Sequence, residues 1–217
     1  MDVQKVDLAN WPRREFWNHY MNEVRCTYAM TAELDASRLL PALKRRGLKL
    51  YPALIHMLSQ VVHRHEEFRY NTGADGEPVL LRSLTPSYTV FHSDDQTFSN
   101  LWTPYSPSFR AFHAAYLEDL RQYGGVHGFD GKPGLPGNCF WISSIPWVRF
   151  TGFHLDIHTD GMDMSPIFTF GKCEPCAGQL RLPLCAQLHH AVCDGFHAAR
   201  LFNEVQALCD EEAWLDE

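Results

Sequence analysis

The spacing of apolar and polar residues along the chain predicts a mixture of helices and strands. Helical spacing of apolar residues, with proline and glycine near several of the ends, predicts helices over 11–23, 35–47, 51–65, 106–124 and about 195–210. Alternating or short apolar segments predict strands over 26–34, 78–84, 87–92, 139–147, 149–157, 166–172 and 180–192, with a turn between the second and third. Because helices and strands are mixed and four strands follow one another late in the chain, we expect an α/β fold, a two-layer sandwich with a mixed β-sheet.

The last predicted strand leads into the segment HHAVCDGFHAAR, residues 189–200. Every second residue of the strand is apolar, namely Leu182, Leu184, Ala186 and Leu188. The same count places His190 on the apolar face and His189 on the polar face. Burial disfavours the imidazolium ion, so His190 is expected to stay neutral, as a general base requires. The pattern therefore favours His190 over His189 as a catalytic base.

Asp194 and Gly195 mark the turn from this strand into the final helix. Two interpretations of Asp194 are open. It is either the N-cap of the helix or a buried carboxylate that orients the histidine turn, and the second role needs a cationic partner.

Two other kinds of site fit the segment less well. A metal site would combine His189, His190, Asp194 and His197, but the adjacent histidines end a strand and point in opposite directions, unlike those of a zincin helix. A Ser-His-Asp hydrolase would need a G-x-S-x-G turn, which the sequence lacks, and Ser143 lies in a predicted strand. We therefore predict no metal.

Composition and charge indicate one ordinary globular domain, residues 1–217. The chain is 45% apolar and 21% charged, and its net charge of −7 argues against a nucleic-acid partner. No apolar run approaches the roughly 18 residues of a membrane span, and the first residues lack an apolar signal core. Together with seven scattered cysteines, which suit reduced thiols, this predicts a cytoplasmic location.

Two further motifs are interpreted as turns and loops. Cys173 and Cys176 form a lone C-x-x-C with a proline inside it and Ala-Gly-Gln after it, which favours a hairpin over a zinc or redox site. The glycine-rich segment 124–137 matches neither phosphate-binding pattern and is expected to be a loop.

The segment HHAVCDGFH resembles the signature of the chloramphenicol acetyltransferases, within a wider HHxxxDG class of coenzyme A-dependent acyltransferases. The resemblance covers nearly the whole chain, through NWPRREFW, KLYPALIHML, YTVFH, TFSNLW, SSIPWVRFTGF, PIFTFGK and LPLCAQLHHAVCDGFH in family order. It implies acetyl transfer from acetyl-CoA to the 3-hydroxyl of chloramphenicol, which inactivates this antibiotic. It also implies a homotrimer with active sites at the subunit interfaces.

The resemblance implies a role for each catalytic residue. His190 matches the base that takes the hydroxyl proton as the oxygen attacks the thioester directly, through a tetrahedral intermediate. Ser143 matches a serine that hydrogen-bonds the oxyanion, and Thr169 matches a threonine that stabilises the intermediate through water. Asp194 matches an aspartate paired with an arginine, and Arg13 stands at the arginine position.

The ligand contacts are also implied by the resemblance. Residues aligned with the antibiotic pocket are Tyr20, Cys26, Phe98, Phe153, Leu155 and Ile167, each of which would otherwise be interpreted as core. Trp147, Lys49 and Lys172 fall where the family contacts coenzyme A, the lysines near its phosphates. Two positions depart from the family: His19 stands where a relative has a pocket phenylalanine, and Cys173 where a tyrosine is common beside the coenzyme. No residue is carried across 124–137.

Two alternatives remain open from the sequence. The first is an acyltransferase of the same fold that acts on another small alcohol. The departure from the family at His19 leaves this alternative open. The second is a non-catalytic protein that sequesters a hydrophobic drug. A dihydrolipoyl acyltransferase is disfavoured because no lipoyl domain or linker is found in the sequence.

Overall fold

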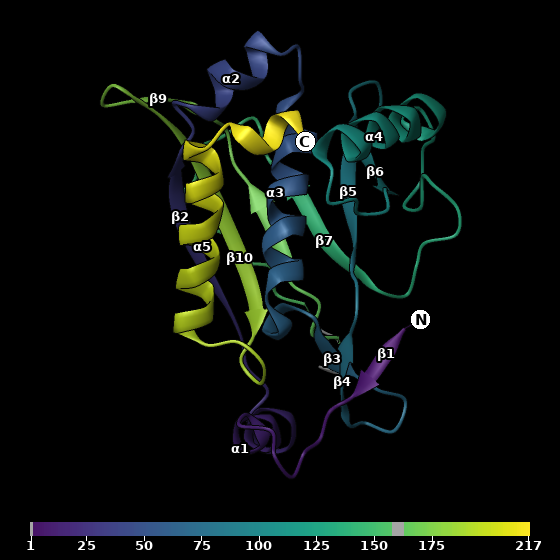
Figure 1. Cartoon of the computed structure of the whole chain (residues 1–217). Coiled ribbons are helices and arrows are strands. Elements are labelled where there is room, and N and C mark those ends of the chain that lie inside the picture. Colours follow the sequence, from purple (N-terminus) through teal and green to yellow (C-terminus); the bar gives the residue numbers. More distant parts are fainter. Residues whose placement is uncertain (1, 158–162) are drawn as a thin grey trace.

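A large mixed sheet forms the centre of the computed structural model, which describes residues 2–157 and 163–217 (Figure 1). Its strands lie in the order β2, β10, β8, β7, β5 and β6, and β9 pairs with β10 beside this path. β7 runs parallel to both β5 and β8, whereas the other pairs are antiparallel. The strand bounds are β2 (Thr27–Asp35), β5 (Thr85–His92), β6 (Thr97–Trp102), β7 (Cys139–Ser144), β8 (Ile167–Phe170), β9 (Glu174–Cys176) and β10 (Gln179–His189).

A second sheet of three short strands has the order β1 (Val3–Lys5), β4 (Pro78–Leu81) and β3 (Tyr70–Thr72). The two strands predicted at 78–84 and 87–92 are present, but they enter different sheets, because β4 belongs to this small sheet and β5 to the large one. β5 instead takes its antiparallel partner from the residues that follow it, across the turn at 93–96. That partner, β6, was not predicted as a strand.

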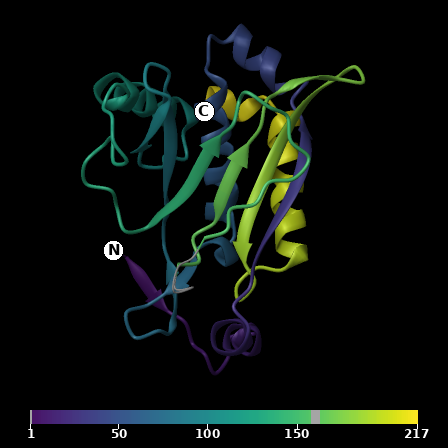
Figure 2. The same ribbon diagram turned by 180° about the vertical axis from the view of Figure 1, so that it is seen from behind.

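Helices form the second layer. α3 (Leu50–Arg64) and α5 (Gly195–Asp210) pack side by side against one face of the large sheet, while α2 (Leu39–Arg45) and α4 (Phe109–Tyr123) lie near its upper end (Figures 1 and 2). α3 is apolar around most of its circumference because it is covered on nearly every side; its completely buried side chains include Ala53, Ile55, Met57, Leu58, Val61 and Val62. The predicted two-layer α/β arrangement is confirmed.

The segment predicted as a first helix, 11–23, divides into two parts. α1 (Arg14–Asn18) is an α-helix, and the π-helical turn η1 (His19–Glu23) follows it directly. Two 3₁₀ turns complete the helical elements of the described residues, η2 (Glu66–Phe68) and η3 (Ala213–Asp216). None of the described helices has the length and apolar character needed to cross a membrane.

The segment 149–157 was predicted as a strand, and this is wrong: it is irregular and lies along one face of β10. Gln187 of β10 accepts a hydrogen bond from the Leu155 amide and donates one to the Leu155 carbonyl oxygen, both at 3.0 Å. The Cys185 thiol donates to the Phe153 carbonyl oxygen at 3.2 Å. Side chains of the strand therefore satisfy backbone groups that a sheet ladder would otherwise pair. The apolar alternation of 149–157 arises from its packing on the sheet.

Candidate functional site

The turn between β10 and α5 is held in shape by Arg13. The Arg13 guanidinium, one residue before α1, donates to the carbonyl oxygens of His190 and Ala191, each at 3.2 Å, and to Asp194 Oδ2 at 3.1 Å. From the other side, the His190 amide donates to the Cys26 carbonyl oxygen at 2.9 Å. The backbone that carries His190 is therefore fixed to the residue before α1 and to the residue before β2.

Asp194 fills both of the roles that the sequence left open. Its Oδ1 accepts a hydrogen bond from the Phe196 amide at 3.1 Å, which caps α5, and its Oδ2 pairs with Arg13. Burial works against the carboxylate form, but the Arg13 hydrogen bond and the charge of His197 outweigh it, so the pKa of Asp194 is lowered. Asp194 thus joins the start of α5 to the segment before α1.

Of the two adjacent histidines, His189 is the more deeply buried, so the expectation that His190 occupies the drier face is wrong. His189 is 4% exposed, and its burial, followed by the neighbouring His190, lowers its pKa to about 4. His190 lies beyond the last residue of β10 and is partly exposed. The alternation misleads here because β10 is covered on both faces, by the helices and by 149–157, so both faces exclude water.

Two aromatic rings hold the His190 imidazole. Tyr20 of η1 stacks on it, with ring centroids 4.4 Å apart and planes 14° apart, and Tyr28 of β2 lies tilted at 5.2 Å. His190 Nδ1 is buried and makes no hydrogen bond to another described residue. This leaves Nε2 as the nitrogen placed to meet a ligand.

Two hydroxyl groups lie side by side on the large sheet. Ser143 of β7 and Thr169 of β8 are direct partners in the parallel register, and their side-chain oxygens are 2.9 Å apart. Thr169 is 1% exposed, whereas Ser143 is only partly buried. Ser143 is therefore the member of the pair that can donate to a ligand while Thr169 supports it.

A mostly apolar cavity of about 1280 Å³ opens beside Ser143. Its walls come from β5, β6, β7, β8, the first turn of α3, and the irregular segment after β7. A smaller cavity of about 210 Å³ adjoins it along the end of β10, and Ile167 lines both. The large cavity has the size and apolar lining of a site for a drug-sized molecule.

Within one chain, His190 and Ser143 lie far apart. Thr169 pairs with Cys185 of β10, and β10 then runs on to end near α1 (Figure 1). His190 follows Cys185 by five residues, which is about 17 Å at the usual rise of a strand. Among the described residues that line the two cavities, His190 does not occur.

The model of the family "Chloramphenicol acetyltransferase" matches residues 1–206. The chain belongs to this family. A chloramphenicol acetyltransferase from Clostridium perfringens is 47% identical over 218 residues, with 100% of both chains covered. One from Clostridium butyricum is 42% identical and covers 100% of this chain and 99% of its own, and one from Streptomyces acrimycini is 45% identical, with 97% and 96% covered.

Solved structures confirm the fold of the family. A chloramphenicol acetyltransferase superposes with a TM-score of 0.84 at 20% identity, covering 96% of this chain and 100% of that one. The dihydrolipoamide acetyltransferase of Azotobacter vinelandii superposes with a TM-score of 0.66 at 17% identity, covering 99% and 93%. The predicted coenzyme A-dependent acyltransferase fold is therefore confirmed.

The residues that the family resemblance assigns to the antibiotic pocket fall into two groups. Phe98, Phe153, Leu155 and Ile167 line the large cavity together with Ser143. Cys26 lines the smaller cavity, and Tyr20 stacks on His190. The second group is thus associated with the end of β10 in this chain, away from Ser143.

Two of the three residues assigned to coenzyme A line the large cavity. Trp147 is 61% exposed and meets Phe91 edge-on at 4.6 Å, and the exposed Lys172 pairs with Glu174 at 3.0 Å. Lys49 is exposed just before α3, next to Leu50 in the cavity wall. The departure at Cys173 also lies in this wall, where burial raises the pKa of its thiol.

Six aromatic residues of the large cavity were not predicted as ligand contacts: Tyr51, Phe91, Tyr116, Phe129, Trp141 and Phe170. Phe91 and Trp141 could have been found from the strands, since large side chains on the face away from the helices need another partner. Phe129 stands in the glycine-rich loop and is 67% exposed. An exposed aromatic residue among glycines, with no core to join, is the signal that the sequence offered.

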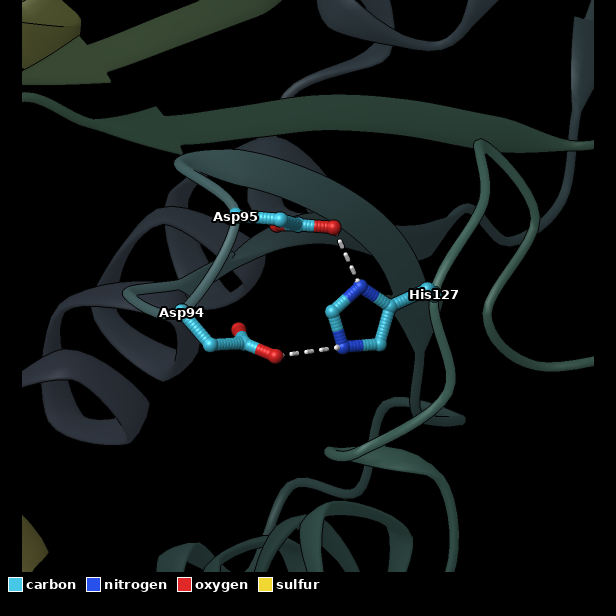
Figure 3. Close-up of side chains that lie close together, drawn as sticks. All are labelled: Asp94, Asp95 and His127. Atoms are coloured by element: carbon cyan, nitrogen blue, oxygen red, sulfur yellow. Dashed lines mark hydrogen bonds and ion pairs between the residues drawn. The ribbon is translucent and has the colours of Figure 1, made fainter.

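One group of potential metal-ligating side chains occurs among the described residues, and it lies away from the predicted histidine motif. His127 of the glycine-rich loop stands between Asp95, with His127 Nδ1 to Oδ2 at 2.7 Å, and Asp94, with Nε2 to Oδ2 at 3.5 Å (Figure 3). Each imidazole nitrogen already faces a carboxylate, and all three side chains are exposed. The arrangement is a cluster of one imidazole and two carboxylates.

Proposed function

We propose that this chain transfers the acetyl group of acetyl-CoA to the 3-hydroxyl of chloramphenicol and so inactivates the antibiotic. The observation that carries the proposal is the family match over residues 1–206, with a relative named chloramphenicol acetyltransferase that is 47% identical along its whole length. The large apolar cavity beside Ser143 supports an aromatic acceptor of drug size.

In the proposed reaction, His190 Nε2 accepts the proton of the acceptor hydroxyl while the oxygen attacks the thioester carbonyl carbon. The tetrahedral intermediate then collapses, the carbon–sulfur bond breaks, and the proton passes from His190 to the departing coenzyme A thiolate. A neutral alcohol is a weak nucleophile, so the base is essential. Stacking by Tyr20 supports this role because it restricts the plane of the imidazole.

Ser143 Oγ is proposed to donate a hydrogen bond to the oxyanion of the intermediate. Its partner Thr169, at 2.9 Å, orients the hydroxyl and assists through water. Removing one such donor typically costs about 2.7–4 kcal/mol of transition-state stabilisation. In the Azotobacter vinelandii dihydrolipoamide acetyltransferase, a serine, a histidine and an asparagine have been investigated for roles in catalysis, which supports the choice of Ser143 and His190.

The active site is proposed to form between subunits of a homotrimer. The separation of about 17 Å along β10 is too long for His190 and Ser143 of one chain to act on the same carbonyl group. A second copy that brings its own His190 to the large cavity would complete the site. Tyr20 and Cys26 would arrive with that His190, since they lie at the same end of β10.

Coenzyme A is proposed to bind along Trp147, Lys49 and Lys172. The lysines would contact its phosphates and Trp147 an apolar part of the coenzyme. Trp147 and Lys172 line the same cavity as Ser143, and Lys49 directly precedes Leu50 of its wall. The proposed steps use side chains alone, so no metal is included. The seven cysteines are free, which supports the proposed cytoplasmic location, and residues 1–217 are proposed to act as one domain.

Mass spectrometry of the drug after incubation with acetyl-CoA tests this proposal directly. We expect the purified protein to add one acetyl group to chloramphenicol, and His190→Ala to bind the drug but lose activity by about 10²–10⁴-fold, the usual worth of a general base. His65→Ala, which removes a histidine paired with Glu204 away from both cavities, is the matched control.

Each other outcome has a defined meaning. Full activity of His190→Ala would show that another group is the base. Coenzyme binding without acetylated drug would point to a different small alcohol, with His19 as the first position to change. Tight drug binding without turnover would favour a sequestering protein.

A further inference from the structure

The glycine-rich loop between α4 and β7 carries Phe129 into the wall of the large cavity. Its ring meets that of Phe98 edge-on, with centroids 6.3 Å apart. The Phe129 carbonyl oxygen accepts hydrogen bonds from the Asn100 amide at 2.8 Å and the Asn100 Nδ2 at 3.2 Å. The loop thus places an aromatic side chain against β6, beside a predicted drug contact.

The loop is firmly attached on the C-terminal side of Phe129. The amide of Gly131 donates to the Asn100 carbonyl oxygen at 3.1 Å, and a Cβ at this glycine would come within 2.8 Å of Ser99 Oγ. Lys132 Nζ pairs with Asp119 at 2.6 Å and lies 3.9 Å from the centroid of the Trp102 ring. Both groups of this ion pair are largely buried, so the loss of either partner would leave an unpaired charge with little access to water.

On the N-terminal side of Phe129, the attachment is His127. Its imidazole lies between the carboxylates of Asp94 and Asp95, which belong to the turn between β5 and β6 (Figure 3). The opposite end of this attachment is also fixed, because Asp95 accepts hydrogen bonds from the Thr97 hydroxyl at 2.7 Å and the Thr97 amide at 3.0 Å. Gly128, at φ +103°, lets the chain bend between His127 and Phe129.

We propose that His127 is a positioning residue for the acceptor substrate. Its contacts with Asp94 and Asp95, here called the clasp, hold Phe129 in the cavity wall and are strongest when the imidazole is protonated. This rests on the proposed function, since the acceptor is taken to be chloramphenicol. Only the imidazolium ion can donate hydrogen bonds from both ring nitrogens, and each nitrogen here faces a carboxylate.

The titratable groups around His127 determine whether the clasp becomes stronger or weaker as the pH rises. From β5 the nearly buried His92 stacks on it at 4.1 Å, and from the turn come the two aspartates. Hydrogen bonds from Thr97, followed by His127 itself, lower the pKa of Asp95 to about 2, so its carboxylate stays charged throughout mild acid. A change of charge in this cluster near neutral pH therefore requires a histidine, the residue type that serves proteins as a switch in that range.

Binding measurements in the His190→Ala background separate this effect from catalysis. We expect chloramphenicol to bind to this variant more weakly as the pH rises from 5.5 to 8. Adding His127→Gln should weaken binding at pH 5.5 by about threefold to fivefold, the scale of a surface ion pair, and flatten the pH dependence. Adding His127→Arg, which stays charged and offers donors to both carboxylates, should keep binding tight at every pH.

With His190 intact, His127→Gln should raise KM for the drug and leave kcat within about twofold, because Phe129 contacts substrate and not the reacting atoms. Arg121→Gln, which breaks the exposed pair with Glu118 on α4, is the control and should change neither. Equal binding by the Gln and Arg variants, or a pH dependence that survives in both, would overturn the proposal. If the unaltered protein does not bind or acetylate chloramphenicol, the proposed function fails instead.

Discussion

At the scale of single residues, Arg13 makes more contacts within the site than its place in a short N-terminal segment suggests. Its guanidinium has three acceptors around the turn, the carbonyl oxygens of His190 and Ala191 and the carboxylate of Asp194. A lysine carries the same charge but cannot reach three separate acceptors with a fixed planar group. The shape of the turn that carries the proposed base therefore depends on the guanidinium itself.

Arg13→Lys should lower kcat at least tenfold with little change in KM, and lower the free energy of unfolding by about 1–3 kcal/mol, since carbonyl groups in a water-poor turn lose their donors. The pKa of Asp194 is lowered in the folded protein. The stability that its pairing contributes is thus complete above the ordinary aspartate pKa near 3.9 and is lost as pH falls through the lowered value. Urea unfolding at pH 7 and pH 3 should show that the loss in free energy of unfolding caused by Arg13→Lys is smaller at pH 3. The same loss at both pH values would mean that the pair of Arg13 and Asp194 contributes nothing to it.

Sequence reasoning reached part of this site at the residue scale. The motif itself indicated that Asp194 caps a helix or meets a cation, and the structure shows both. Arg13 could not be found from spacing, because it lies about 180 residues away in a segment that resembles an ordinary exposed helix. The family resemblance supplied it. The burial of His189 was missed because the cover over β10 comes from a segment without regular structure.

At the scale of elements, helices were predicted well, whereas one predicted strand is absent and the partners of the strands were not predicted. A helix is specified by its own residues, and α5 occupies 195–210 as predicted. A strand needs a partner that the sequence does not name: β4 and β5 entered different sheets, and 149–157 entered none. The turn in the hairpin after Cys173 was predictable because the proline of the C-x-x-C motif and the Ala-Gly-Gln after it are local turn signals. In the structure Ala177 and Gly178 both adopt positive φ.

The irregular segment 149–157 offers a prediction at this scale, because one side chain holds it. Gln187 makes two hydrogen bonds to the backbone of Leu155 and is 6% exposed. Gln187→Leu should raise KM for the acceptor by roughly tenfold, since the part-buried amide and carbonyl of Leu155 lose their partners and Leu155 shifts in the cavity wall. Gln187→Glu keeps the acceptor for the Leu155 amide, so its KM should lie between those of the unaltered protein and Gln187→Leu. Steady-state kinetics at saturating acetyl-CoA would show this, and an unchanged KM in both variants would mean that 149–157 is held by other contacts.

At the scale of the whole molecule, the distance between His190 and Ser143 leads to a test that needs no partner structure. If each active site takes His190 from one chain and Ser143 from its neighbour, His190→Ala and Ser143→Ala are each inactive for a different reason. Mixed trimers would contain some interfaces in which the intact histidine of one variant meets the intact serine of the other. Random assembly from equal amounts gives such interfaces in about a quarter of sites.

We therefore expect two nearly inactive variants to regain about a quarter of the original activity when they are unfolded together and refolded as a mixture. The same variants refolded separately and then combined should stay inactive until subunits exchange, which controls for contamination. Product should be counted by mass spectrometry, since seven cysteines would react with thiol reagents. Mixed trimers that form but remain inactive would mean that one chain supplies both residues, and β10 would then have to move to bring them together.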